Sequence, residues 1–234
     1  MCGRYVSATP PDQIAAYFEA EAPEALLEPS YNVAPTKDVY AVLSDGTTRV
    51  VDAFHWGLVP LWAKEAKIGS KMINARAETL AEKNAYKSAF RKRRCIIPAD
   101  GFYEWQKNAQ DPKGKKQPFY IHRPDGEPYA FAGLWEVWRG PNKDQEPLRS
   151  CTIITTDANA EMAKIHDRMP VILPASAWDT WLDRDIDDLD LLGKLLVPAP
   201  PEIIQMHTIS TEVNNVRNDG PQLTDQAPPL EEAS

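Results

Sequence analysis

The succession of strand-like and turn-like segments constrains the fold of this chain more than any other feature. Short runs of β-branched and aromatic residues are separated by loops containing glycine, proline and lysine, and they do not alternate regularly with helical segments. A doubly wound parallel sheet requires that alternation. The sequence therefore predicts an α+β fold, a single domain whose curved, mostly antiparallel, barrel-like β-sheet is flanked by helices. Strands are expected at 39–43, 49–56, 95–98, 101–106, 119–122, 130–138, 151–155 and 203–209, the first two forming a hairpin.

The best helix is expected at 78–93, where Leu80, Ala85, Ala89 and Phe90 lie on one side and cations fill the last turn. Shorter helices are expected after Pro10 and at 159–165, 176–182 and 186–196. The chain contains no convincing domain boundary. We therefore expect one domain at 2–218 and a disordered tail at 219–234.

The composition excludes several classes of protein. No apolar run approaches the roughly 20 residues of a membrane span, and a signal-peptide pattern is missing, so a cytoplasmic protein is expected, nucleoid-associated if the source is bacterial. Cys2, Cys95 and Cys151 are odd in number and widely spaced, which argues against a disulfide framework or a zinc site. HExxH, GxSxG, Walker A and GxGxxG motifs are all missing from the sequence, and no metal or cofactor is expected.

The charge is distributed unevenly. The net charge is −8, with acids concentrated late in the chain, whereas residues 83–94 contain six cations and no acid. Local field governs the binding of a phosphate backbone. The basic stretch is therefore either a surface that faces nucleic acid or a solvated helix face, and the sequence leaves both open.

Cys2 follows the initiator methionine directly. Aminopeptidases that remove initiator methionine generally accept a small second residue, so we expect the mature chain to begin at Cys2. Its free amine, with a pKa of about 8, and its thiol, with a pKa of about 8.5, then lie on adjacent carbons. With an aldehyde the amine forms an imine, and the thiol closes a thiazolidine ring on the same carbon. The same pair could also perform acyl transfer, and a frayed, unimportant terminus is the third interpretation.

Two further segments carry groups suited to this chemistry. Asn74 and Arg76 are two residues apart, so in an extended segment their side chains share one face, where they could orient a nucleophile and hold a phosphate. The alternative is ordinary helix-entry chemistry. Glu104 lies among aromatic residues, which favours a raised pKa and proton transfer, although alternation along a strand could also leave it exposed.

His166-Asp167-Arg168 could shuttle a proton while Arg168 binds an anion, although a lone histidine is more often structural. The segment from Trp56 to Trp62 is rich in aromatic residues and proline. Core packing is one role for it, and stacking of unpaired bases is the other.

Seven segments, in order, resemble the SRAP family, the SOS-response-associated peptidases or abasic-site processing proteins. They are Met1-Cys2-Gly3-Arg4-Tyr5, Tyr31-Asn32-Val33-Ala34-Pro35-Thr36, Trp56-Gly57-Leu58-Val59-Pro60, Asn74-Ala75-Arg76-Ala77-Glu78-Thr79, Arg94-Cys95-Ile96-Ile97-Pro98, Gly101-Phe102-Tyr103-Glu104-Trp105 and His166-Asp167-Arg168-Met169-Pro170. The resemblance covers roughly residues 2–218.

The resemblance implies a self-processing thiol peptidase that crosslinks to abasic sites in single-stranded DNA, with a lyase-like activity. Cys2 would be the nucleophile, both for removal of Met1 and for capture of the C1′ aldehyde of the opened sugar. By position, Asn74 would hold the Cys2 region, Glu104 would transfer protons, and His166 would assist sugar opening or reversal. The DNA-binding residues it implies are Arg4, Arg76, Arg168, Trp56 and Trp105.

Two other functions remain open from the residues. One is an N-terminal-nucleophile hydrolase acting on an amide or peptide, which would turn over amides without a stable DNA adduct. The other is a single-strand DNA-binding module, whose salt-sensitive binding would survive Cys2→Ala. A monomer is expected in each case, with abasic single-stranded DNA as the partner in the first-ranked interpretation.

Overall fold

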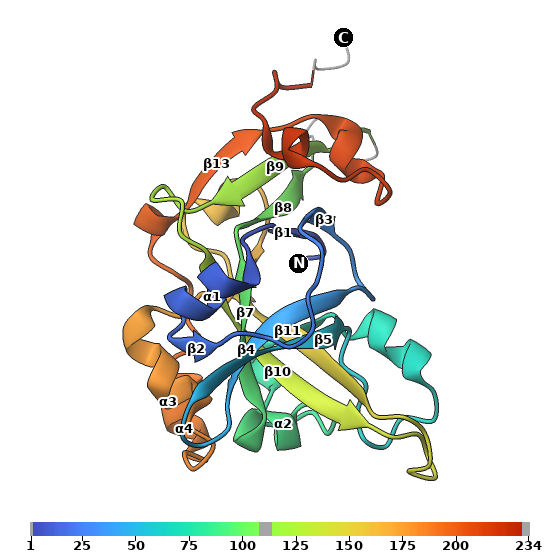
Figure 1. Ribbon diagram of the computed structural model, residues 1–234. Coiled ribbons are helices and arrows are strands. Elements are labelled where there is room, and N and C mark those ends of the chain that lie inside the picture. Colours follow the sequence, from blue (N-terminus) through green and yellow to red (C-terminus); the bar gives the residue numbers. More distant parts are fainter. Residues whose placement is uncertain (1, 108–113, 231–234) are drawn as a thin grey trace.

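The computed structural model describes residues 2–107 and 114–230. Its lower half in Figure 1 is a closed five-stranded β-barrel. Antiparallel pairing runs from β11 through β10, β7 and β4 to β5, and a parallel contact between β5 and β11, at Cys151 opposite Trp56, closes the ring. The bounds are β4 (Asp38–Ser44), β5 (Arg49–Trp56), β7 (Arg94–Ala99), β10 (Tyr129–Trp138) and β11 (Leu148–Asp157). Short strands extend it: β2 (Ala20–Glu21), β6 (Asn74–Arg76) and β12 (Arg168–Pro170).

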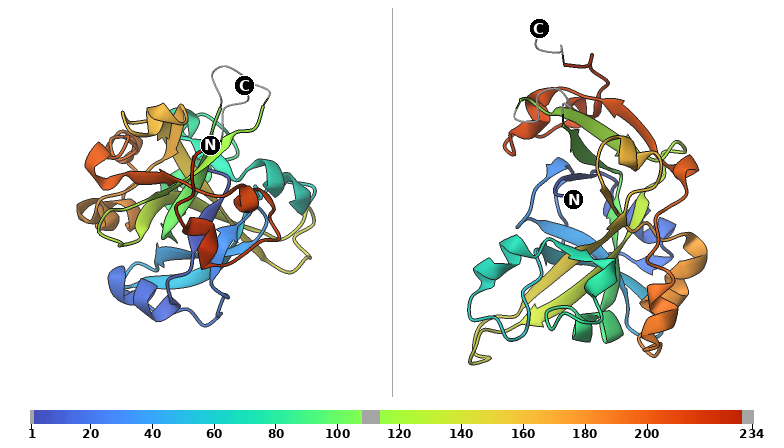
Figure 2. Two further views of the ribbon diagram at one scale, coloured as in Figure 1. Left: turned by 90° about the horizontal axis from the view of Figure 1, so that it is seen from above. Right: turned by 180° about the vertical axis from the view of Figure 1, so that it is seen from behind.

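A second sheet of five strands lies above the barrel in Figure 1. Its order is β13 (Gln205–Thr208), β9 (Gln117–His122), β8 (Gly101–Gln106), β1 (Tyr5–Ser7) and β3 (Ser30–Val33). Strand β1 therefore lies inside the sheet, with Tyr5 paired to Val33 on one side and to Phe102 on the other. This pairing fixes the start of the chain between the two sheets, as Figures 1 and 2 show.

The two sheets are continuous through the connection from β7 to β8. Gly101 opens β8, and a Cβ atom there would lie 2.4 Å from the Tyr120 ring and 2.6 Å from the carbonyl oxygen of Ile121. Only glycine allows β8 to approach β9 this closely. The turn between the sheets thus depends on a residue without a side chain.

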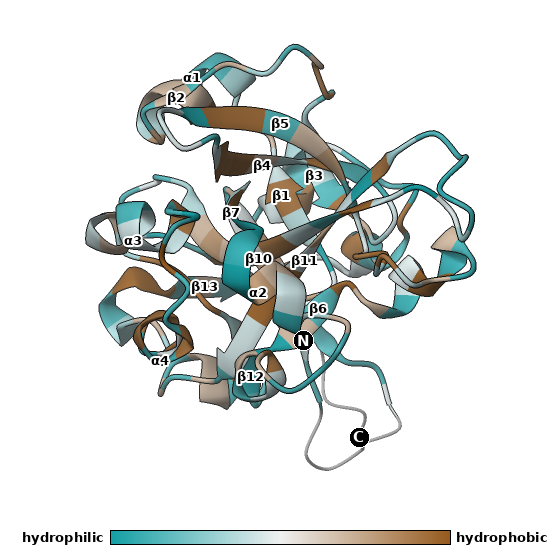
Figure 3. Ribbon diagram, turned by 90° about the horizontal axis from the view of Figure 1, so that it is seen from below, coloured by the Kyte–Doolittle hydropathy of each residue, from teal (hydrophilic) through white to brown (hydrophobic). Residues whose placement is uncertain are grey.

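Alternate residues of the barrel strands contribute to two hydrophobic clusters. Along β4, Tyr40 and Val42 pack in the cluster that also receives the helices, whereas Val39 and Ala41 pack in the cluster that contains Cys2. This is the period-2 pattern of a strand buried on both faces. Figure 3 shows the hydrophobic stretches of β4 and β5.

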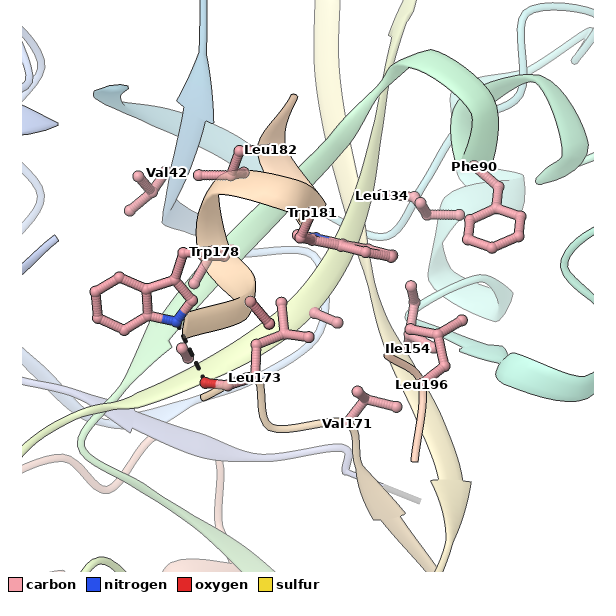
Figure 4. Close-up of a cluster of buried hydrophobic side chains, with 14 of the residues drawn as sticks. Val42, Phe90, Leu134, Ile154, Val171, Leu173, Trp178, Trp181, Leu182 and Leu196 are labelled. Carbon is pink, nitrogen blue, oxygen red and sulfur yellow. Dashed lines mark hydrogen bonds between the residues drawn. The ribbon is translucent and has the colours of Figure 1, made fainter. Parts of the chain in front are cut away.

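In the described part of the chain, four short α-helices cover the barrel: α1 (Pro11–Tyr17), α2 (Lys87–Lys92), α3 (Trp178–Leu182) and α4 (Leu189–Gly193). Trp178 and Trp181 of α3 pack in the same cluster as Tyr40 and Val42. The Trp178 Nε1–H donates to the carbonyl oxygen of Leu173 (Figure 4). The 3₁₀ segments are η1 (Ala66–Lys71), η2 (Ala77–Thr79), η3 (Met162–Lys164), η4 (Ala175–Ala177), η5 (Pro201–Ile203), η6 (Thr211–Asn214) and η7 (Pro221–Thr224).

The fold confirms the α+β, barrel-like expectation and the hairpin of β4 and β5, but one helix is wrong. Residues 78–93 form η2, a turn region and the short α2 instead of one helix. Leu80 and Phe90 are buried as the periodicity indicated, but separate turns of chain bury them. The basic stretch at 83–94 is not a single exposed surface, because Arg94 is 3% exposed and donates to five backbone carbonyls.

The tail also differs from the disordered segment expected from residue 219. Asp219 accepts hydrogen bonds from Ser30 and Tyr31, and Leu223 is 1% exposed. Ala227 donates its N–H to the carbonyl oxygen of Thr208 at 2.9 Å. Residues 219–230 therefore pack against the second sheet, because Leu223 and these backbone groups find partners that the composition of the tail does not reveal. Residues 231–234 lie outside the described part of the chain.

Candidate active site

Cys2 is fully buried at the junction of the two sheets. Its side chain packs in one cluster with Tyr5, Trp56 and Cys151, and its exposed fraction is 0%. Asn74 of β6 donates from Nδ2 to the carbonyl oxygen of Cys2 at 2.8 Å. Asn74 Oδ1 is buried and has no hydrogen-bond partner among the described residues. The structure therefore places Asn74 where the resemblance implied, with one acceptor left to serve a reacting group.

The segment that carries Asn74 is held by an unusually close backbone crossing. Gly57 has φ of +137°, and a Cβ atom on Gly69 would lie 2.4 Å from the Gly57 carbonyl oxygen. Beyond the crossing, Met72 accepts from the Leu58 N–H, and Ile73 accepts from the Trp56 indole at 3.0 Å. These contacts lead the chain into β6, so the position of Asn74 depends on a contact that no side chain can enter.

Glu104 of β8 is buried instead of exposed, with 4% of its surface accessible. Burial raises the pKa of its carboxyl group from 4.5 to about 7, and the charge of Asp167 adds to that rise. The carboxyl group can therefore give up or take a proton near neutral pH, which suits general acid–base catalysis. The sequence expectation of a raised pKa among aromatic residues agrees with this environment.

The thiol of Cys2 is close enough to Glu104 for their charges to interact. Burial raises the pKa of the Cys2 thiol well above its usual range, and the Glu104 charge raises it further. The nearby backbone N–H of Arg4 lowers the pKa of the thiol and so acts in the opposite direction. The thiol is consequently protonated at neutral pH and needs a base before it can act as a nucleophile.

His166 follows η3 and is partly buried. Its Nδ1 accepts from the backbone N–H of Arg168 at 3.0 Å. Asp167 lies 2.9 Å from the same Nδ1. Burial lowers the pKa of His166 in spite of Asp167, so the neutral ring dominates at pH 7.

The His166 loop is tied to the strand of Glu104. Gln106, two residues beyond Glu104, donates from Nε2 to the carbonyl oxygen of Lys164 at 2.7 Å. Together with the charge interaction between Asp167 and Glu104, this bond brings the loop beside β8. The structure thus gathers a thiol, an amide, a carboxyl group and a neutral imidazole from four segments far apart in the sequence.

The DNA-binding residues that the resemblance implies differ in exposure and in hydrogen bonding. Trp56 is wrong as a base-stacking residue, because it is 0% exposed and its indole N–H is bound to Ile73. Arg76 is exposed and lies two residues from Asn74. Trp105 is partly exposed, and its Nε1–H donates to Asn214 Oδ1 at 2.6 Å.

The other two arginines already have partners within the chain. Arg4 donates from Nη1 to Asn32 Oδ1 at 2.7 Å and to the carbonyl oxygen of Val213 at 2.8 Å. Arg168 pairs with Glu78 and with Asp157, at 2.8 and 2.6 Å. Arg168 would have to give up some of these bonds to hold a phosphate, whereas the printed bonds of Arg4 engage only its Nη1.

One residue escaped the sequence interpretation, and a second lies in the segment that the sequence left open between core packing and base stacking. Thr155 pairs with Arg76 across β11 and β6, and its hydroxyl is buried without a hydrogen-bond partner in the described part of the chain. The sequence signal for Thr155 was the interruption of the apolar run of β11 by three threonines. Trp62 is 60% exposed between two surface hollows, and Lys67, Lys71, Lys87 and Arg91 are among their lining residues. Its position after Pro60, in a turn, was the signal that it differs from Trp56.

Within residues 2–107 and 114–230, no group of three His, Cys, Asp or Glu side chains is arranged to hold a metal ion. Among the described helices, none has the length and apolar composition that crossing a membrane requires.

Comparisons with known proteins agree with the resemblance. The family model described as SOS response associated peptidase (SRAP) matches residues 1–216. The abasic site processing protein YoqW of Bacillus subtilis (strain 168) is 44% identical over 225 residues, covering 95% of this chain and 98% of that protein. YoaM of the same organism, also named an abasic site processing protein, is 42% identical over 227 residues, covering 96% and 98%.

A crystal structure of a protein from Bacteroides thetaiotaomicron superimposes with a TM-score of 0.85 at 25% identity, covering 97% of this chain and all of that chain. The match of both sequence and fold extends across both sheets and includes every segment of the candidate site. The chain belongs to the SRAP family.

Proposed function

We propose that this protein processes abasic sites in single-stranded DNA by attaching itself to them through Cys2. The single observation that carries the proposal is the position of Cys2. Asn74 binds its backbone carbonyl oxygen, and its thiol is near enough to the buried carboxyl group of Glu104, whose pKa is about 7, for their charges to interact. Two relatives that match nearly the whole chain are named abasic site processing proteins, which supports the same substrate.

The first step is removal of Met1, because an acylated nitrogen cannot form an imine. Glu104 takes the thiol proton, and the sulfur attacks the Met1 carbonyl carbon. Glu104 returns that proton to the peptide nitrogen, which leaves as the Cys2 amine, with Met1 held as a thioester. Water then hydrolyses the thioester, which releases free methionine and restores the thiol. A buried carboxylate beside a protonated thiol suits such nucleophilic catalysis.

Capture of the lesion follows from the same pair of groups. The Cys2 amine adds to the C1′ aldehyde of the opened sugar and gives a carbinolamine. Protonated Glu104 supplies the proton with which the hydroxyl group leaves as water, and an imine remains. The sulfur then bonds to the same carbon, its proton moves to the nitrogen, and a thiazolidine ring closes. A carboxyl group with a pKa near 7 can serve both steps.

The remaining residues receive supporting roles. Neutral His166 assists opening of the sugar, because an imidazole that titrates below neutral pH can exchange a proton with it. Arg76 is the phosphate ligand that needs no rearrangement, since its side chain is exposed beside Asn74. Exposed Trp62 and partly exposed Trp105 are the aromatic faces available for unpaired bases.

The test is a denaturing gel of the purified protein with a single-stranded oligonucleotide that carries one abasic site. We expect a heat-stable shifted band with the wild-type protein, no band with Cys2→Ala, and slower appearance with Glu104→Gln and with Asn74→Ala. An oligonucleotide with a tetrahydrofuran in place of the abasic sugar lacks the aldehyde and should give no band.

Intact-mass measurement provides the matching control for processing. The crosslinked species should contain the chain without Met1, and the increase in mass should equal that of the oligonucleotide less one water. Retention of Met1 in the crosslinked protein, or a wild-type lane without any shifted band, would contradict the proposed chemistry.

A further inference from the structure

Asn32 connects the start of the chain to its C-terminal region. It lies on β3, is 4% exposed, and accepts from Arg4 Nη1 at 2.7 Å. Its Nδ2 faces three backbone carbonyl oxygens of residues 211–219, which we call the strap. These are Val213 at 3.3 Å, Asn215 at 3.1 Å and Asn218 at 2.8 Å. A buried amide whose oxygen and nitrogen both have hydrogen-bond partners fixes its neighbours in one arrangement.

The strap is also fastened to the strand that carries Glu104. Trp105 donates its indole N–H to Asn214 Oδ1 at 2.6 Å, and Val213 is fully buried in a cluster with Tyr103. At its far end, Asp219 accepts from the Tyr31 N–H at 2.6 Å. One segment therefore restrains β3, β8 and, through Asn32, the residues that precede β1.

Arg4 transmits this restraint to Cys2. Its guanidinium group is held by Asn32 and Val213 and lies 5.6 Å from the centre of the Trp105 ring. Its carbonyl oxygen accepts from the Tyr103 N–H at 3.0 Å. With both its side chain and its carbonyl fixed, Arg4 restrains the backbone two residues after Cys2.

We infer that Asn32 is a positioning residue for Cys2, which acts by locking Arg4 between the strap and β8. The inference rests on the proposed function for its catalytic consequence. Charged guanidinium groups that bind two internal acceptors and stack on an aromatic ring are costly to withdraw.

The experiment compares Asn32→Ala with the wild-type protein in single-turnover crosslinking to abasic single-stranded DNA, over a range of DNA concentrations. We expect the limiting rate to fall by about tenfold to a hundredfold, since small displacements of a nucleophile cost rate. The DNA concentration that gives half of that rate should stay within about twofold, because Asn32 does not reach the DNA. Asn142→Ala, an exposed amide in the loop between β10 and β11, should match the wild type.

A second variant protects the test from a simple loss of folding. Asn214→Ala removes only the acceptor of the Trp105 indole at the protein surface, so the hydrogen bonds of the Asn32 side chain remain. It should fold, as thermal unfolding will show, and should lower the limiting rate by a smaller factor than Asn32→Ala does. Limiting rates equal to the wild type in both variants would overturn the inference.

The alternative role of Arg4 has a different signature. If Asn32 merely held Arg4 for a phosphate, Asn32→Ala would raise the half-saturating DNA concentration and leave the limiting rate unchanged, which also overturns the inference. Hydrogen exchange separates this outcome from failure of the proposed function. If the wild-type protein forms no adduct, the proposed function fails. Faster exchange of residues 2–7 in Asn32→Ala, and not in Asn142→Ala, would still support the positioning role of Asn32. Unchanged exchange refutes it.

Discussion

At the scale of single residues, burial creates the chemistry of this site. Glu104 and Cys2 are ordinary groups whose surroundings disfavour their charged forms, so a proton is retained on each near neutral pH. The same burial that makes Cys2 a poor nucleophile on its own makes Glu104 a competent base. The two groups therefore complement one another, because the thiol needs a base and the carboxyl group titrates near neutral pH.

The raised pKa of Glu104 predicts a pH-dependent cost to folding. Because the folded state holds the proton more tightly, stability is fully present below a pH of about 4.5 and declines as the pH rises to about 7. Glu104→Gln lacks this decline. We expect the free energy of unfolding of the variant, relative to the wild type, to rise by about 3 kcal/mol between these pH values and then level off.

Urea unfolding at several pH values measures this difference. The exposed Glu202→Gln serves as the control and should show a constant difference from the wild type across the range. A flat curve for Glu104→Gln as well would show that the carboxyl group of Glu104 titrates in the same way in the folded and unfolded chain.

Individual site residues were predictable from the sequence to different degrees. Asn74 and Glu104 lie in short segments whose extended conformation and aromatic neighbours already indicated their roles. Trp56, Arg4 and Arg168 were not predictable in the same way, because their partners lie far along the chain. The acceptor of the Trp56 indole is Ile73, and Arg168 meets Glu78 across 90 residues. Sequence patterns report local periodicity, whereas these contacts arise from tertiary packing.

At the scale of elements, the strands followed the sequence more closely than the helices did. The hairpin of β4 and β5 and the apolar runs of β7 and β10 have local signals, namely turn residues and β-branched stretches. Strands β1, β3, β6 and β12 are three or four residues long and exist because longer strands pair with them. The helix expected at 78–93 failed because its apolar residues are buried by tertiary contacts, which periodicity alone cannot distinguish from a continuous helix.

The crossing of Gly57 and Gly69 predicts a strong and local sensitivity to substitution. A Cβ atom at Gly69 would overlap the backbone of Gly57, which has no side chain to move aside. Gly69→Ala should lower the free energy of unfolding by about 2–3 kcal/mol. It should also slow crosslinking, because the displaced segment leads to Asn74.

Gly193 offers a matched control. An added Cβ there meets nothing within 4 Å, and the residue closes α4. Gly193→Ala should leave crosslinking unchanged and should leave stability equal or higher by up to about 1 kcal/mol. Equal effects of the two substitutions, in denaturant unfolding and in crosslinking, would show that the crossing does not hold β6.

At the scale of the whole molecule, an acidic protein presents a local basic surface. The net charge is −8, yet lysines and an arginine surround the exposed ring of Trp62. The acids of the late segment lie elsewhere, with Asp179, Asp183 and Asp185 lining a different hollow beside β4 and α3. This separation of charge allows binding of a polyanion in spite of the overall repulsion.

Binding of intact single-stranded DNA should separate the roles of the ring and the cations. Trp62→Ala should weaken binding about tenfold and leave the slope of log affinity against log salt unchanged, because stacking releases no counterions. Lys71→Met should reduce the magnitude of that slope by about 0.7. Fluorescence anisotropy at several salt concentrations measures both, and Leu26→Ala, at another exposed apolar residue, should have no effect. Unaltered affinity in Trp62→Ala would exclude this surface from the DNA path.

The interior position of β1 has a consequence for how the protein is made. Its two neighbours are β3, which is synthesised soon afterwards, and β8, which leaves the ribosome about a hundred residues later. Asn32 finds its acceptors only when residues 213–218 have also emerged. A nascent or prematurely terminated polypeptide thus lacks the contacts that place Cys2 beside Asn74 and Glu104 in the finished fold.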